Sequence, residues 1–369
     1  ALIDYRGKTP KKVGNGIPLI TAKVVKSGRI LPMDEFIADE DYESWMVRGI
    51  PQVGDIVVTT EAPLGEVAQI KDANVALAQR IVTLRGKVDF LENNFLLFLM
   101  QSNFVQNQLE ARATGSTVKG IKQSELRKVI LPIPPINEQK SIGKILSDLD
   151  DKIHLNNKIN ETLESIAQAI FKSWFIDFEP VRAKIAAKQT GQDPERAAMC
   201  AISGKSEAEL EQMVKEDFAE LQATAALFPD ELLESELGEV PKGWELQQIK
   251  DIAKYCTNKI SLKDLTLENY ISTENMLPEK KGIEKASSLP KANSVPAFRK
   301  GNILVSNIRP YFKKIWLSSF DGGHSNDVLN FEVLEKETEE YLYNLIYRDS
   351  FFDQMMASSK GSKMPRGDK

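Results

Sequence analysis

Side chains suited to hydrogen bonding with nucleic acid cluster in the segment 306–314. An Asn amide can form two hydrogen bonds with an adenine edge and an Arg guanidinium two with a guanine edge, whereas Lys suits phosphates. The segment supplies all three types, in the order Asn307, Arg309, Lys313 and Lys314. No acid lies between Arg299 and Lys314. A capped β-turn would use Asn307 equally well, so both interpretations stay open.

The strand that leads into this turn occurs twice in the chain. Gly54-Asp-Ile-Val-Val-Thr59 resembles Gly301-Asn-Ile-Leu-Val-Ser306 at an offset of 247 residues. Each is a glycine turn followed by an apolar, largely β-branched run. An amphipathic helix is expected later in each half, at 94–100 and 340–346, and a Gly-Ser loop follows each helix. A period this long indicates a duplicated domain rather than a solenoid.

The duplication supplies matching candidate groups in both halves. The turn 59–63 of the first copy carries hydroxyls and an acid where the second copy has Asn307 and Arg309, so the two copies should read different bases. The Gly-Ser loops place lysines beside backbone N–H groups, which suits phosphate contact. Turn stabilisation is an equally good explanation for the two threonines. The predicted DNA-contacting residues are Thr59, Thr60, Arg80, Ser116, Thr117, Lys119, Lys122, Asn307, Arg309, Tyr311, Lys313, Lys314, Ser362, Lys363 and Arg366.

A long helix is expected between the two copies. A lead-in rich in proline ends at Asn137, which we interpret as the N-cap of a helix over 138–178. At 1.5 Å per residue such a helix is about 60 Å long. One polar residue at a seam position is the device that fixes register and partner number in a coiled coil. The predicted seam is Ile142, Ile145, Leu149, Ile153, Asn156, Ile159, Leu163, Ile166, Ile170 and Trp174.

The residue pattern of this segment resembles that of one known family. Pro134-Pro135-x-x-Glu138-Gln139, Leu149-Asp150-x-Lys152-Ile153, and Leu163-Glu164 followed by Phe171-x-x-Trp174-Phe175 are similar to the central region of specificity subunits from Type I restriction–modification systems. The resemblance implies a non-catalytic subunit that binds a bipartite double-stranded DNA target. It also implies methylation (M) and restriction (R) subunits as partners.

The resemblance also implies the domain organisation. The expected fold is α+β, with two duplicated mixed strand and helix target-recognition domains separated by a long coiled-coil helix. We expect the first recognition domain at 1–131, with an incomplete N-terminus, and the spacer helix at 132–180. An acidic helical insert at 181–239 and the second recognition domain at 240–369 follow. Complete family members pair two spacer helices antiparallel, and this sequence contains one.

A seam of this length is too apolar to stay exposed. We expect self-association through antiparallel spacer helices, in which Asn156 of two copies would meet near the middle. Coverage of the seam by the acidic insert or by a partner chain are the alternatives.

Charge and composition agree with a DNA-binding protein once the chain is divided. The net charge is −5, but residues 205–239 hold eleven acids and two lysines, so the remainder carries +4. Two cysteines, Cys200 and Cys256, fit a reducing cytoplasm. No apolar run reaches membrane-spanning length, and the two histidines offer no zinc spacing.

Two segments partly match enzymatic motifs, and neither match is complete. Gly115–Gly120 is close to a phosphate-binding loop, but Ile121 stands where the essential Lys must be. Glu279-Lys280-Lys281, with Asp264 upstream, has the shape of a nuclease motif but lies in a stretch expected to be a polar loop. We therefore expect no catalytic residues, no cofactor and no metal. The alternative is the specificity half of a fused restriction–modification enzyme with its own nuclease or methylation activity.

Overall fold

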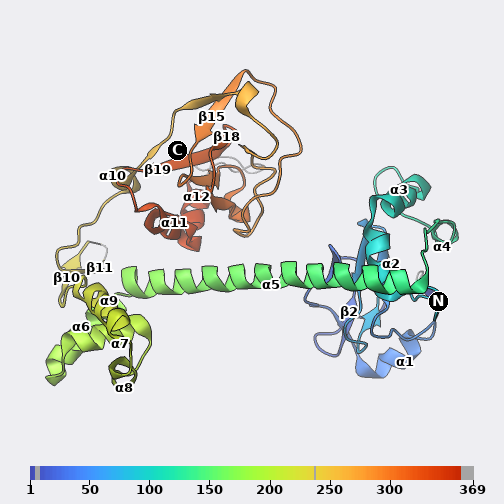
Figure 1. Ribbon diagram of the computed structural model, residues 1–369, viewed down its shortest axis with the longest axis horizontal. Coiled ribbons are helices and arrows are strands. Elements are labelled where there is room, and N and C mark those ends of the chain that lie inside the picture. Colours follow the sequence, from blue (N-terminus) through green and yellow to red (C-terminus); the bar gives the residue numbers. More distant parts are fainter. Residues whose placement is uncertain (5–8, 237, 359–369) are drawn as a thin grey trace. The chain divides into compact units, whose positions relative to one another are not determined.

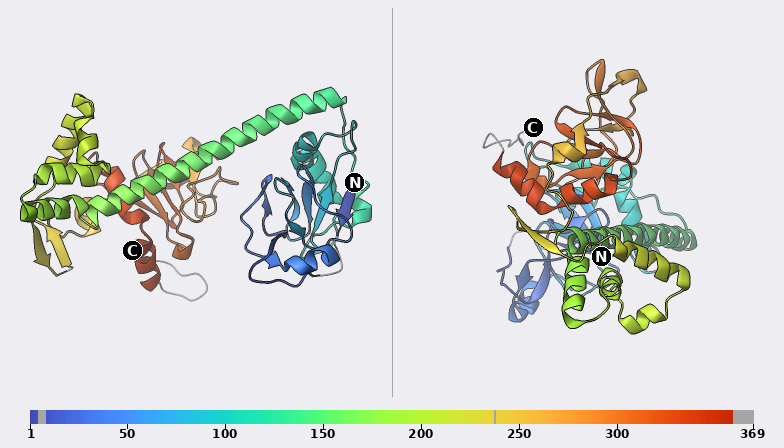
Figure 2. Two further views of the ribbon diagram at one scale, coloured as in Figure 1. Left: turned by 90° about the horizontal axis from the view of Figure 1, so that it is seen from below. Right: turned by 90° about the vertical axis from the view of Figure 1, so that its left-hand side faces the viewer.

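The computed structural model combines small, mainly antiparallel sheets with helices, one of which has 40 residues (Figures 1 and 2). It describes residues 1–4, 9–236 and 238–358. The chain divides into two units, Ala1–Asn160 and Glu161–Lys369, and each contains its own hydrophobic cores. The expected α+β fold class is confirmed.

Strand β6 forms the centre of the main sheet in the first unit. Its sequence, Ile-Val-Val-Thr-Thr, is β-branched throughout, and all five residues are buried. It pairs antiparallel with β7 and β9, and β1 completes the order β1-β9-β6-β7. These strands are β1 (Leu2–Asp4), β6 (Ile56–Thr60), β7 (Leu64–Gln69) and β9 (Ile81–Leu84).

Helices pack on one face of this sheet. The Glu92 side chain caps α2 (Asn93–Gln101) by accepting a hydrogen bond from the backbone of Phe95, and Ser102 caps α3 (Asn103–Arg112) in the same way. Their apolar side chains join Val58 and Val82 of the sheet in one core. The short helix α4 (Gln123–Leu126) adds Leu126 to that core.

A smaller sheet completes the first unit. Its order is β5-β2-β8, with β2 and β8 parallel, and its apolar residues share a core with Val57 and Ala68 of the main sheet. The elements of this region are β2 (Ile17–Ile20), β3 (Val25–Lys26), β4 (Arg29–Ile30), β5 (Phe36–Ile37), the 3₁₀ helix η1 (Asp39–Asp41), α1 (Tyr42–Trp45) and β8 (Ala76–Leu77).

The second unit repeats this architecture. Its main sheet has the order β12-β19-β16-β17 and is antiparallel throughout. Strands β16 and β19 each begin 247 residues after β6 and β9, and helices α11 and α12 begin 246 residues after α2 and α3. The predicted duplication is therefore confirmed. The elements are β12 (Ala253–Tyr255), β16 (Ile303–Ser306), β17 (Ile315–Leu317), β19 (Val328–Val333), α11 (Glu339–Tyr347) and α12 (Asp349–Ala357).

The smaller sheet is repeated as well. Its order is β13-β15-β18-β14, and the parallel pair β14–β18 matches the parallel pair β2–β8 of the first unit. The elements are α10 (Ile249–Ile252), β13 (Lys259–Ser261), η2 (Leu262–Asp264), β14 (Tyr270–Ile271), β15 (Ser294–Phe298), η3 (Pro310–Phe312) and β18 (Gly322–His324).

The long helix α5 (Ile136–Phe175) is drawn in green in Figure 1. Its first backbone hydrogen bond runs from Gln139 N–H to the carbonyl of Pro135, so Asn137 lies inside the first turn. The predicted N-cap was therefore wrong by two residues, because the carbonyl of Pro135 is already available to the helix. The helix ends before Phe178, which adopts a left-handed conformation with φ 53°.

A helical insert follows α5. It contains α6 (Glu179–Thr190), α7 (Pro194–Ser203), α8 (Glu207–Glu211) and α9 (Lys215–Ala226), and the hairpin β10 (Leu232–Ser235) and β11 (Gly238–Pro241). Ala198, Met199, Leu210 and Ala225 form a separate small core. The helices agree with the sequence-based expectation, whereas the hairpin was not anticipated.

A buried glutamine attaches the start of α5 to the first unit. The Gln139 side chain is 1% exposed. Its Nε2 donates to the carbonyls of Phe90 (3.0 Å) and Pro134 (2.8 Å), and its Oε1 accepts from Glu92 N–H at 3.0 Å. About three turns further along, the Arg29 guanidinium contacts the Asp150 carboxylate at 2.5 Å. Contacts with Phe90, Glu92 and Arg29, all distant in sequence, therefore fix the first half of α5.

We predict that Gln139→Ala lowers the free energy of unfolding of the first unit by about 2–4 kcal/mol, because three backbone groups lose their partner in a buried site. Urea denaturation, monitored by amide hydrogen exchange at Glu92, measures the change in the free energy of unfolding. The exposed neighbour provides the control: Glu138→Ala should change stability by less than about 0.5 kcal/mol. If both substitutions changed the free energy of unfolding equally, the structural role assigned to Gln139 would be contradicted.

Candidate DNA interface

The predicted residues of the first domain gather at one end of its main sheet. The turn between β6 and β7 contains Glu61, whose carboxylate pairs with Arg80 Nε at 3.0 Å. The loop 114–120 lies beside this turn, because Ile121 N–H donates to the carbonyl of Thr60 and Glu61 forms a bridge with Gly120. Segments separated by about 20 and 60 residues thus form one surface.

The two threonines of this group do not face outward. Thr59 is 0% exposed and Thr60 is 3% exposed. The Thr59 hydroxyl accepts a hydrogen bond from Glu66 N–H at 2.9 Å, and the Thr60 hydroxyl donates to the carbonyl of Arg80 at 3.1 Å. Both hydroxyls therefore hold the turn together, and the expectation that they present themselves to DNA is corrected.

The Gly-Ser loop of the first domain is exposed. Thr114 and Gly120 close it with two mutual backbone hydrogen bonds of 2.9 Å. Ser116, Thr117, Lys119 and Lys122 all lie on the surface. Lys119 Nζ contacts the Glu110 carboxylate at 2.5 Å, an exposed pair that costs little to exchange for a phosphate.

The corresponding turn of the second domain carries a different side chain at the equivalent position. Arg309 occupies the position of Ala62, each precedes a proline, and both have left-handed φ values, 52° and 49°. Arg309 is exposed, and Tyr311 is 46% exposed. Asn307 is 6% exposed; its N–H donates to the carbonyl of Asp327, and its buried Oδ1 accepts no hydrogen bond from the described residues.

The two predicted phosphate ligands of this turn differ in their surroundings. Lys313 and Lys280 both contact the Asp349 carboxylate, at 3.1 and 2.6 Å, and their hydrogen bonds lower the pKa of Asp349. Lys314 Nζ instead donates to the carbonyl of Thr273 at 2.6 Å. Burial, together with the charge of Arg309, lowers the pKa of Lys314. Lys314 therefore stabilises the turn from inside, which corrects its assignment as a phosphate ligand.

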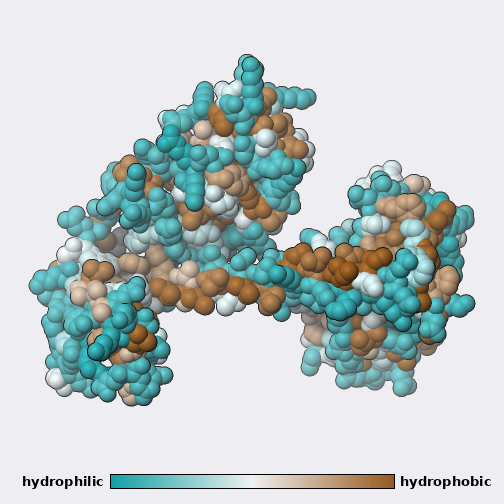
Figure 3. All heavy atoms as spheres, in the orientation of Figure 1, coloured by the Kyte–Doolittle hydropathy of each residue, from teal (hydrophilic) through white to brown (hydrophobic). Residues whose placement is uncertain are grey.

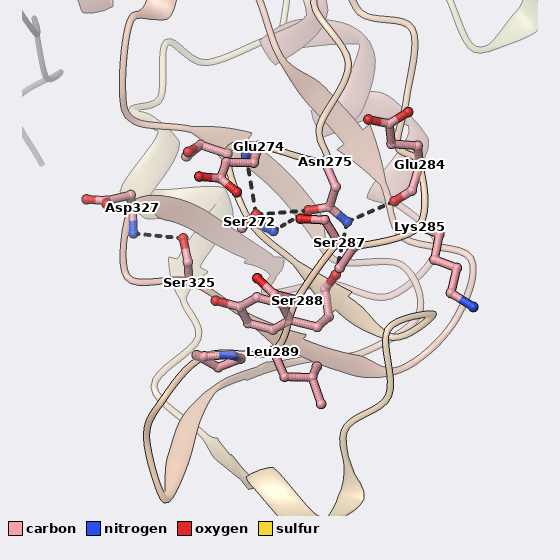
Figure 4. A pocket seen from close by; sticks show the side chains of 14 residues that line it. Ser272, Glu274, Asn275, Glu284, Lys285, Ser287, Ser288, Leu289, Ser325 and Asp327 are labelled. Atoms are coloured by element: carbon pink, nitrogen blue, oxygen red, sulfur yellow. Dashed lines mark hydrogen bonds between the residues drawn. The ribbon is translucent and has the colours of Figure 1, made fainter. Parts of the chain in front are cut away.

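A polar cavity of about 290 Å³ flanks this turn (Figure 4). Thr273 and Asp327, the residues whose carbonyls receive Lys314 and Asn307, both line it. Asn275 organises one wall: its Oδ1 accepts from Ser272 N–H at 2.6 Å, and its Nδ2 donates to the carbonyls of Tyr270 and Glu284. Glu274 also lines the cavity. The sequence analysis did not predict this cavity. The only local signal for it was the hydroxyl residues that follow β14.

The remaining predictions concern the C-terminal loop and the helix seam. Ser362, Lys363 and Arg366 lie outside the described residues. Along α5 the seam is exposed, from 38% at Ile142 to 60% at Ile153, and appears as brown spheres along the helix in Figure 3. Asn156 is also exposed. Trp174 differs from the other members, because its ring packs edge-on against Phe228 with centroids 5.6 Å apart.

Two further properties bear on the class of protein. Among the described residues, no group of three or more His, Cys, Asp or Glu side chains could hold a metal ion. None of the described helices combines the length and apolarity needed to cross a membrane.

Part of the chain is similar to known proteins of one family. Residues 6–165 match the model of the Type I restriction modification DNA specificity domain. The chain is 37% identical over 203 residues to the Type I restriction enzyme HindI specificity subunit of Haemophilus influenzae, covering 52% of this chain and 44% of that protein. It is 29% identical over 244 residues to the MjaIX specificity subunit of Methanocaldococcus jannaschii, covering 65% and 46%. The chain is therefore similar to Type I restriction–modification specificity subunits, and it spans less than half the length of these two relatives.

Two solved structures also align with most of the chain. A Type I restriction–modification S subunit from M. genitalium aligns with 97% of this chain and 77% of its own, with a TM-score of 0.41 and 14% identity. The HsdS subunit from Thermoanaerobacter tengcongensis aligns with 95% and 78%, with a TM-score of 0.32 and 13% identity.

The structural role of Thr59 leads to a prediction. Thr59→Val should lower the free energy of unfolding by about 1–2 kcal/mol, because Glu66 N–H would be left without an acceptor in a buried site. The matched substitution Thr117→Val, in the exposed loop, should change it by less than about 0.5 kcal/mol. Chemical denaturation of both variants measures the difference. A Thr59→Val variant as stable as the parent would restore Thr59 as a candidate ligand contact.

Proposed function

We propose that this chain recognises a bipartite double-stranded DNA sequence, with each duplicated domain reading one part. The observation that carries the proposal is the pair of turns at the ends of β6 and β16. They share a strand order, a residue offset and a left-handed residue before proline, yet one projects Ala62 and the other Arg309. Equivalent positions with different side chains are what two readers of different sequences require.

The exposed residues fall into two groups, one suited to contacts with base edges and one suited to contacts with phosphates. Arg309 can form two hydrogen bonds with a guanine edge, and Tyr311 lies next to it. Lys119, Lys122 and Lys313 suit phosphates, since each sits on the surface or in a solvent-accessible ion pair. Arg80 is also accessible, with its side chain 53% exposed.

We further propose the role that the resemblance of the helix segment and the relatives' description as specificity subunits together indicate. The chain would act in the cytoplasm as the non-catalytic specificity subunit of a complex, docking methylation and restriction subunits onto the chosen DNA. Residues 1–131 and 240–369 would serve as recognition domains, 132–180 as the spacer helix, and 181–239 as an insert. The apolar seam of α5 supports self-association through antiparallel helices.

The function is tested by selecting bound sequences from randomised DNA, with a methylation subunit present. We expect two short specified blocks around an unspecified gap. Arg309→Ala should relax one block only and cost about 1–3 kcal/mol for the parent sequence, because one bidentate base contact is lost.

An exposed lysine provides the control. Lys122→Ala should weaken binding to all sequences alike and reduce the salt slope by about 0.9, as expected for one phosphate contact. Selection of a single continuous block, or of none, would refute the proposal. Uniform weakening by Arg309→Ala would instead make Arg309 a phosphate contact.

Self-association of α5 is tested separately. Ile153→Asp combined with Leu163→Asp should convert a dimer into monomers, because both residues lie in the middle of the exposed seam. Light scattering at several concentrations measures the molar mass. Lys152→Asp, on an exposed position outside the seam, is the matched control and should leave the dimer intact. A parent chain that is monomeric throughout would exclude pairing through this seam.

A further inference from the structure

A cluster of ion pairs lies beside the turn that carries Arg309. The Asp349 carboxylate, in the first turn of α12, contacts Lys280 Nζ at 2.6 Å and Lys313 Nζ at 3.1 Å. The two lysine side chains are 15% and 26% exposed, and Lys280 Nζ also lies 4.4 Å from the centroid of the Tyr347 ring. Contacts with two largely covered cations are screened less by water and salt than an exposed ion pair is.

The turn beside this cluster has a backbone conformation that few residues adopt unaided. Arg309 and Lys313 flank the 3₁₀ helix η3, and both have left-handed φ values, 52° and 49°. Such a conformation is unfavourable for most residues other than glycine, so it persists where neighbouring groups impose it. Since η3 has three residues, a change of backbone conformation at Lys313 is expected to move Arg309 as well.

A neighbouring loop contacts the same turn through its backbone. Glu279 N–H donates to the carbonyl of Phe312 at 2.8 Å, and Lys280 N–H donates to the carbonyl of Lys313 at 3.0 Å. Lys280 is therefore connected to the turn twice, directly through its backbone and indirectly through its side chain and Asp349. The Asp349 carboxylate thus joins the loop, the turn and helix α12.

The first domain holds its own turn from the equivalent helix. The strand pairings align Gly65 with Lys313, because Val67 and Ile315 oppose equivalent valines of β6 and β16. Gly65 is left-handed too, with φ 84°. Gln106 of α3 donates from Nε2 to the carbonyl of Gly65 at 2.8 Å. In each domain a side chain of the same helix therefore binds the left-handed residue that ends the turn, through an amide in one case and a carboxylate in the other.

We propose that Asp349 is a positioning residue for DNA recognition by the second domain, because its contacts with Lys280 and Lys313 hold Arg309 in the orientation that reads a base. The inference rests on the proposed function, in which Arg309 contacts a base edge. Asp349 acts through the two lysines and not by contact with DNA. Their hydrogen bonds lower the pKa of Asp349, so the carboxylate is ionised at neutral pH. Lys313 still has N–H groups for a phosphate, because an ammonium has three donors.

The test uses the full chain with a methylation subunit, the selected parent duplex, and duplexes with one base pair changed in either block. Discrimination is the ratio of the dissociation constants for the changed and the parent duplex. Asp349→Ala should lower discrimination at the base pair read by Arg309 about fivefold or more, and leave the other block within about twofold. Asp349→Glu should retain most of the discrimination, because its carboxylate can still accept from both lysines. Asp353→Ala is the matched control: this exposed acid of α12 acts on Lys313 through its charge, and its removal should change discrimination by less than about twofold.

Binding to a duplex of unrelated sequence separates positioning from damage to the domain. A positioning role predicts that Asp349→Ala binds this duplex at least as tightly as the parent chain does, because its phosphate contacts remain. Weakening on every duplex alike would overturn the inference, as would equal loss of discrimination in Asp349→Ala and Asp349→Glu. Unchanged discrimination in Asp349→Ala, with loss in Arg309→Ala, would overturn the inference and leave the proposed function standing. Unchanged discrimination in both variants would refute the proposed function together with the inference.

Discussion

The buried amide of Gln139 is the contact on which the arrangement of the first unit depends. A 40-residue helix has many exposed positions and few that fix its direction. Gln139 is almost fully buried and bonds three backbone groups, two of them in the segment 90–92 that begins α2. A buried polar side chain of this kind is costly unless every hydrogen bond is formed, so it permits one orientation of the helix start. The Arg29–Asp150 pair then fixes the rotation of α5 further along.

The opposite end of α5 is held by different forces within the second unit. Phe171 is 4% exposed and packs with Phe175 and Tyr341. Phe175 also stacks on Trp244, with ring centroids 5.9 Å apart. Aromatic contacts bury large areas and tolerate small shifts, whereas a triply bonded amide does not. Burial also raises the pKa of Glu164, whose charged form is favoured there by Lys280 and Gln168. The two ends of the helix are thus fixed by hydrogen bonding in one unit and mainly by apolar packing in the other.

Local signals in the sequence predicted the duplicated strands and the long helix, but not the hairpin β10–β11 or the surfaces. The duplication was predictable because Gly54 and Gly301 each open a strand of the same type, and the fold preserves that offset in β6, β9, β16 and β19. The burial of Thr59 was not predictable, because β6 is covered on both faces by segments far away in sequence. From the sequence alone, Lys314 is expected to be a surface cation. In the fold it donates to the carbonyl of Thr273, which lies 41 residues earlier in the chain.

Equivalent positions with unequal surroundings are the most informative product of the duplication. At the turns, one domain carries Ala62 and the other Arg309, so the two domains present different side chains at equivalent positions. At the helices, Gln108 binds both backbone groups of Ile130, whereas the Gln354 side chain is exposed. Hydrophobic burial favours covering the seam of α5, because each buried large side chain contributes about 1.5–3 kcal/mol. Along that seam Ile145, Leu149 and Ile153 are all more than half exposed. Asn156 lies within the seam, where an amide disfavours misaligned pairing because a buried polar group needs a partner.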